Sequence, residues 1–134
     1  MPIVALAILG LLGIVGGFVA SRVGGSRSAA DPASTFTRWW RISRWLGVAL
    51  AVASWPLTGF MAYPYAGANG KPGHVAGIPF MAAYFDEQGR DYVGTQTMVA
   101  VLANAVFWYL FPRLVVVVLD TLREQRERAR ANAN

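Results

Sequence analysis

Three long stretches without a charged residue constrain this chain more than any other feature. Residues 2–21, 45–70 and 92–112 contain no Asp, Glu, Lys or Arg, and their most apolar parts read IVALAILGLLGIVGGFVA, LGVALAVASWPLTGFMAY and MVAVLANAVFWYLF. A helix needs about 20 apolar residues to cross a hydrocarbon layer of about 30 Å. The stretches lack the alternation of apolar and polar residues that marks barrel strands. The sequence therefore predicts an all-α integral membrane protein with three transmembrane helices, over about residues 3–22, 45–64 and 96–118.

Composition supports one membrane domain over residues 1–134. Only 14% of the residues are charged and 55% are hydrophobic, whereas soluble domains carry about 25% charged residues. The first stretch resembles a signal peptide in its position, but no Lys or Arg precedes it, and Arg22 and Arg27 follow it. A cleaved signal has its basic residues before the apolar run. We therefore expect a retained helix.

The distribution of Lys and Arg predicts the orientation. Residues 21–44 contain five arginines and one acidic residue, and residues 113–134 contain another five arginines; residues 66–94 contain only Lys71 and Arg90. Cytoplasmic loops of membrane proteins are enriched in Lys and Arg. We therefore expect an N-out, C-in protein of the bacterial inner membrane, cytoplasmic at 23–44 and 119–134, with a Gly-rich exoplasmic loop at 65–95. The net charge of +5 is then a topology signal, and no nucleic-acid partner is expected.

Residue types that usually act in catalysis or in metal and cofactor binding are scarce. The chain has no cysteine, which excludes disulfides and thiolate sites, and its one histidine, His74, lies outside the predicted spans. No phosphate-binding loop, nucleophile elbow or HExxH motif occurs. We expect no enzyme, no metal site and no cofactor of its own, with contact to cofactors of neighbouring subunits left open.

Small residues recur on one stripe of the first predicted helix. They are Gly10, Gly13, Gly17 and Gly24, with Ser21 between the last two. Small residues let two membrane helices approach closely, so this stripe is predicted to be a packing face. Asn104 is the strongly polar residue deep in the third span and is expected to hydrogen-bond to another helix. The sequence leaves open whether helix two, a second copy or another protein packs there.

Arginine and tryptophan are interleaved just before the second span, in STFTRWWRISRW. Indole rings favour the headgroup level, and arginines attract anionic lipid. We expect an interfacial helix here, capped by Asp31 or Ser34, which then turns into the span. Arg113 is expected to extend to the inner headgroups. The predicted anchors to anionic phospholipid, with structural lipids bound, are Arg38, Trp39, Trp40, Arg41, Arg44, Trp45 and Arg113.

An apolar segment too short to span, IPFMAAYF, follows the Gly-rich part of the exoplasmic loop. We expect it to rest on the membrane surface or on a neighbouring subunit, because large apolar side chains in an exposed loop need cover. The side chains predicted to dock a partner are Ile78, Phe80, Met81, Tyr84 and Phe85.

Two motifs of the second half support a resemblance. Gly77, Ile78, Pro79 and Phe80 form a G-x-P-F loop, and Asn104 begins an N-x-x-F-W-Y-L sequence in the last helix. The chain resembles uncharacterised small bacterial multi-span membrane proteins that carry such motifs. The resemblance implies bacterial origin and membrane residence.

Two classes of function remain. The first is a non-catalytic accessory subunit packed on a larger membrane complex of respiratory or photosynthetic type, with other membrane subunits and lipid as partners. The second is a self-assembling small channel or transporter, which normally places polar residues at mid-membrane. The first class agrees better with the scarcity of such residues.

Overall fold

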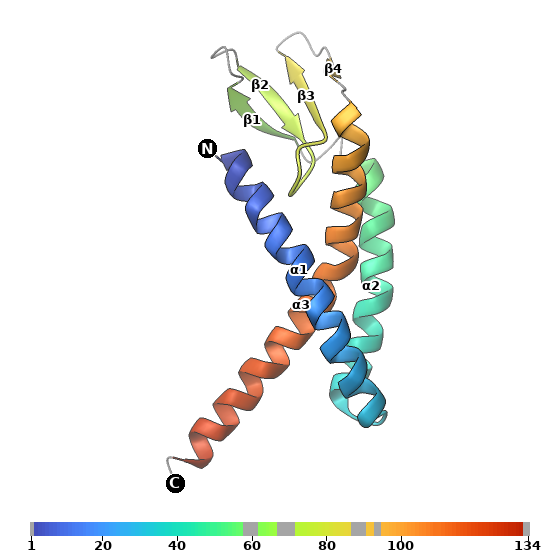
Figure 1. Cartoon of the computed structure of the whole chain (residues 1–134), viewed down its shortest axis with the longest axis vertical. Helices are drawn as coiled ribbons and strands as arrows, with labels where there is room; N and C mark the ends of the chain where they lie inside the picture. Colours follow the sequence, from blue (N-terminus) through green and yellow to red (C-terminus); the bar gives the residue numbers. More distant parts are fainter. Residues whose placement is uncertain (1, 58–61, 67–71, 87–90, 93–94, 133–134) are drawn as a thin grey trace.

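The computed structural model describes residues 2–57, 62–66, 72–86, 91–92 and 95–132. These segments form three helices and four short strands (Figure 1). In chain order they are α1 (Pro2–Ala30), α2 (Thr35–Leu57), β1 (Ala62–Ala66), β2 (Pro72–Ala76), β3 (Ala83–Asp86), β4 (Asp91–Tyr92) and α3 (Thr95–Ala131). The strands lie at one end of the molecule, beyond the start of α1 and the start of α3 (Figure 1).

Two helices have the length and the apolar composition to cross a membrane. They are Ile3–Ala30 within α1 and Thr97–Ala131 within α3, and only 17% and 22% of the residues in their apolar windows are buried inside the chain. A helix that forms the core of a soluble domain shows the opposite pattern. Of the expected span at residues 45–64, residues 45–57 belong to α2, residues 58–61 lie outside the described part of the chain, and residues 62–64 belong to β1, so the prediction of helix is wrong for these last three.

The connection between α1 and α2 is shorter than expected. α1 continues to Ala30, and α2 begins at Thr35 as one helix that includes both the Arg- and Trp-rich segment and the start of the second span. The Ser34 hydroxyl accepts a hydrogen bond from the backbone N–H of Thr37 (3.2 Å), which caps α2. The prediction of an interfacial helix that turns into the span is therefore wrong, because one continuous helix includes the Arg- and Trp-rich segment and the start of the span.

The region expected to be a Gly-rich loop contains an antiparallel sheet of order β1-β2-β3-β4. Tyr63 pairs with Val75, Val75 with Tyr84, and Tyr84 with Tyr92. Val75 and Ala76 are completely or almost completely buried. The description of residues 65–95 as a loop is wrong, because pairing between neighbouring strands supplies backbone hydrogen bonds that local sequence does not reveal.

The helices have a polar and small-residue interior and an apolar exterior. The buried polar side chains are Thr37, Ser43, Ser54, Asn104 and Arg113. Large apolar side chains on α1, among them Leu12, Val15 and Phe18, are 58–63% exposed. An apolar exterior of this extent is unusual for a monomer in water and typical of a helix surface that meets lipid or other membrane helices.

Candidate functional site

The glycine stripe of α1 packs against other parts of the same chain. A Cβ atom built on Gly13 would lie 2.5 Å from the Phe107 ring, and one on Gly17 would lie 2.6 Å from Cβ of Leu110. Both partners belong to α3, which α1 crosses at this point (Figure 1). Gly10 instead lies against Pro79 and Phe80 in the connection between β2 and β3. The sequence left open what packs against the stripe; at Gly10, Gly13 and Gly17 the packing partner is another part of the same chain.

Gly24, nearer the end of α1, lies directly against the indole of Trp40 on α2. Trp40 is 7% exposed and stacks on Phe36, with ring centroids 6.0 Å apart. The expectation that Trp40 is an interfacial anchor is therefore wrong. The absence of a side chain at Gly24 creates the space that this indole fills.

A close contact between α2 and α3 depends on Gly47, which the sequence reasoning missed. A Cβ atom at Gly47 would collide with the backbone carbonyl oxygen of Tyr109. The signal was present in the sequence, since Ser43, Gly47 and Ala51 form a repeat of small residues four apart, the pattern that permits close approach of membrane helices.

Asn104 binds the backbone of Phe80 in the turn between β2 and β3. Its carboxamide oxygen accepts the Phe80 N–H (2.8 Å), and its amide nitrogen donates to the Phe80 carbonyl (2.8 Å). Trp108, one turn later on α3, donates its indole N–H to the Ile78 carbonyl (3.0 Å). Asn104 is 2% exposed. The expected bond to another helix is wrong; α3 instead uses Asn104 to hold the turn at 77–82 against the helices (Figure 1).

The segment expected to dock a partner is mostly part of a turn and a strand of the chain itself. Ile78 and Phe80 belong to the turn held by α3, while Tyr84 and Phe85 belong to β3. These four are half-buried, and Met81 is exposed at 42%. Residues 78–85 are therefore not a separate apolar stub, because residues 78–82 belong to the turn and residues 83–85 belong to β3.

Arg113 is the most unusual side chain in the interior. It is 8% exposed, and its guanidinium carbon lies 4.0 Å from the centre of the Tyr109 ring. Its hydrogen bond within the described residues is a long one to the Ser21 hydroxyl on α1 (3.4 Å), and its buried Nε has no partner there. Arg113 is therefore not an exposed anchor, because its side chain is buried against α1 and α2. It lies instead where the three helices meet, because its face of α3 points toward α1 and α2.

A cavity of about 200 Å³ lies beside Arg113, between α2 and α3. Arg41, Arg44, Trp45 and Val48 of α2 line it, with Tyr109 and Arg113 of α3. In the part of the chain that the structure describes, no carboxylate lies within 4.0 Å of these three guanidinium groups. The cavity therefore concentrates positive charge.

The other predicted anchors lie on the outside of α2. Arg38, Trp39, Arg41, Arg44 and Trp45 are exposed, Trp39 at 56% and Trp45 at 74%. A second hollow of about 410 Å³ includes Arg38 and shares Arg41 and Trp45 with the first. The basic residues of α2 thus follow one side of the helix.

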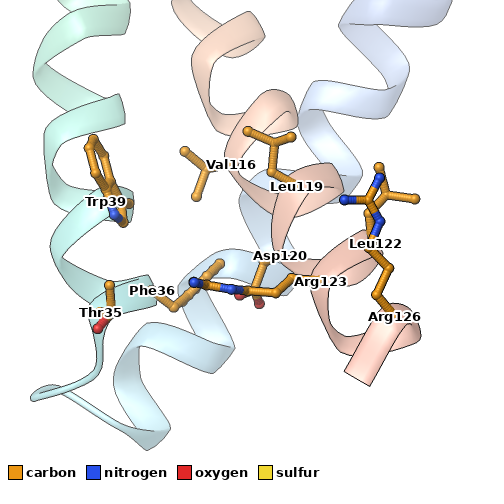
Figure 2. A pocket seen from close by; sticks show the side chains of 9 residues that line it. All are labelled: Thr35, Phe36, Trp39, Val116, Leu119, Asp120, Leu122, Arg123 and Arg126. Carbon is orange, nitrogen blue, oxygen red and sulfur yellow. The ribbon is translucent and has the colours of Figure 1, made fainter. Parts of the chain in front are cut away.

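A larger groove of about 510 Å³ lies on the opposite side of α2, against the C-terminal half of α3. Figure 2 shows Phe36 and Trp39 of α2 on one side of it and Val116 and Leu119 of α3 on the other. Asp120 pairs with Arg27 of α1 (2.8 Å) and Arg123 approaches Glu127 (4.0 Å), while Arg126 has no ion pair among the described residues. The lining of this groove therefore combines apolar side chains with one unpaired arginine, whereas three arginines without a carboxylate partner line the smaller cavity.

The described residues contain no group of three or more His, Cys, Asp or Glu side chains that could hold a metal ion. The strongest chemical capability of the described residues is recognition of an anion by guanidinium groups. The chain is thus a helical protein with two helices able to cross a membrane and a basic cavity lined by one buried and two exposed arginines. Comparison with models of protein families, with curated proteins and with solved structures finds no match.

Proposed function

We propose that the chain is a non-catalytic accessory subunit that packs on a larger integral-membrane complex of respiratory or photosynthetic type in the bacterial inner membrane. In this proposal the apolar parts of α1, α2 and α3 span the membrane, with the N-terminus outside and the C-terminus inside. The balance of arginines between the segments supports that orientation.

The main support for the proposal is that interior polar side chains form hydrogen bonds within the chain. Asn104 holds the turn at Phe80. Ser43 donates to the Trp40 carbonyl (2.8 Å), and Ser54 donates to the Ala51 carbonyl (2.7 Å). These bonds satisfy the side chains of Asn104, Ser43 and Ser54 within the chain's own helices and turn; among the described buried polar side chains, Arg113 is the exception. A pore or transport path needs polar groups that face a water-filled route, so this arrangement favours a structural role over a channel.

The exposed face of α1 is the surface that we assign to the larger complex. Its glycine stripe contacts α3 and α2, while the other sides carry large apolar residues with about half or more of each side chain exposed, including Ile8, Leu11, Leu12, Val15 and Phe18. A helix that holds its own bundle by one narrow stripe leaves a broad surface for neighbouring helices.

Photo-crosslinking in native membranes tests this assignment. A benzoylphenylalanine residue at Leu12 or Val15, which are 63% and 61% exposed, should give one defined adduct with a larger membrane protein. The matched control is Val52 on α2, which is 70% exposed and should not give that adduct. Adducts with a second copy of the chain would instead support the self-assembling channel. The same weak set of adducts from all three positions would contradict a specific partner at α1.

A further inference from the structure

We infer that the cavity between α2 and α3 binds the phosphate of an anionic phospholipid through Arg113, Arg41 and Arg44. The site is independent of which proteins surround the chain. Three observations support it: Arg113 is buried without a counter-charge, no described carboxylate pairs with the arginines of the cavity, and an apolar strip of α2 begins at the cavity.

Arg113 is more than nine-tenths buried, and its Nε has no hydrogen-bond partner among the described atoms. The contact with the Tyr109 ring and the long bond to Ser21 leave most of its five N–H donors without an acceptor. A buried guanidinium without a counter-charge is unfavourable, because desolvation is not compensated. The cavity at its side gives a counter-ion room to bind.

The counter-ion is best supplied by phosphate. Arg41 and Arg44 line the same cavity, and no described carboxylate pairs with any of the three arginines. The planar fork of a guanidinium matches phosphate oxygens in a bidentate arrangement. Three such groups around one small cavity form a site for an anion with several acceptor oxygens.

The surroundings indicate that the phosphate belongs to a lipid. From the arginines, the same face of α2 continues through Trp45, Val48, Val52 and Trp55, whose side chains are 74%, 43%, 70% and 68% exposed. A residue recurs on one helix face every three or four positions, so these side chains form one apolar strip that begins at the basic cavity. A phospholipid has the same order, with a charged phosphate followed by acyl chains. The neighbouring hollow at Arg38 and Ser34 leaves room for the rest of the headgroup.

Native mass spectrometry of the delipidated full chain in mild detergent tests the site. The probes are phosphatidylglycerol, phosphatidylcholine of matched acyl chains, and inorganic phosphate. We expect at least about tenfold preferential retention of phosphatidylglycerol over phosphatidylcholine. Arg41→Gln combined with Arg44→Gln should reduce that preference about tenfold or more, from about 1 kcal/mol per arginine at a lipid surface. Both residues are exposed, so this variant is expected to fold.

The control is Arg126→Gln combined with Arg130→Gln, which changes the net charge equally at exposed positions away from the cavity. It should retain phosphatidylglycerol as the unmodified chain does. Equal loss in both double variants would show only general attraction between charges and would overturn the site. Equal retention of both lipids would also overturn it, and so would binding of inorganic phosphate without a preference for phosphatidylglycerol, which would assign the cavity to free phosphate. Arg113→Lys is a separate test. The preference for phosphatidylglycerol over phosphatidylcholine should fall in this variant although the positive charge remains, because the planar fork of the guanidinium is lost.

Discussion

Replacing Gly47 by leucine should separate α2 from α3 and lower the free energy of unfolding by about 3 kcal/mol, the upper part of the range for overpacked interiors. The physical reason is that a Cβ at this position meets the carbonyl oxygen of Tyr109, which is part of a helix backbone and cannot rotate away. Even Gly47→Ala should be destabilising. The measurement is the midpoint of unfolding in a graded detergent-to-dodecyl-sulfate series.

The matched control is Gly25→Ala on α1, where a Cβ would meet no atom within 4 Å. Alanine favours a helix over glycine by up to about 1 kcal/mol, so this variant should be neutral or slightly more stable. If Gly47→Ala and Gly25→Ala behaved alike, the close approach of α2 and α3 would be contradicted.

Asn104→Leu should release the turn at residues 77–82 from α3. The substitution keeps the branched shape and the number of non-hydrogen atoms of the side chain but removes both hydrogen bonds to Phe80, so that the partly buried N–H and carbonyl of Phe80 lose their partners. We expect a loss of about 2 to 4 kcal/mol, because an unsatisfied buried polar group costs about 1 to 3 kcal/mol.

A local measurement separates this effect from global unfolding. The chain has no cysteine, and Ala82 is 4% exposed. A single cysteine at Ala82 should therefore resist thiol labelling in the parent chain and become reactive when Asn104→Leu is added. Val106→Ala, at a 40% exposed position of the same helix, should leave the cysteine protected. Protection that persists in the Asn104→Leu variant would refute the role assigned to Asn104.

The uncharged stretches of the sequence located the helices well, because apolar runs of this length have few alternatives. The end of α1 was harder to predict. Residues 23–30 are mostly small and include Arg27, a composition that predicts a loop. In the structure they are helical, and Arg27 forms ion pairs with Asp120 and Glu124 on α3 (2.8 and 3.1 Å). Such pairs join distant parts of the chain, so no local pattern contains them.

The sheet was missed for a related reason. β1 reads AYPYA and β2 reads PGHVA, and proline and glycine inside such short segments indicate turns when they are read locally. Only the pairing of β1 with β2, and of β2 with β3, makes strands of them. The exposure of Arg113 was also misjudged, because its position along α3 gives its level in the helix but not the face on which it lies.

For the glycine stripe, the sequence indicated close packing but not the partner. Gly13 and Gly17 contact α3, Gly10 contacts the turn at Pro79, and Gly24 contacts Trp40. These partners arise from the way the three helices and the turn are arranged in space. Gly47 could have been predicted in the same way, because Ser43, Gly47 and Ala51 form a repeat of small residues in α2.

The central claim is that this chain works as one subunit of a larger membrane complex. The most direct measurement is the native mass of the species obtained when the tagged chain is extracted from its own membranes in mild detergent. The account predicts a single assembly in which the chain, of 14.5 kDa, is present at fixed stoichiometry with larger membrane proteins. A species built only from one or several copies of the chain, with bound lipid and nothing else, would contradict it.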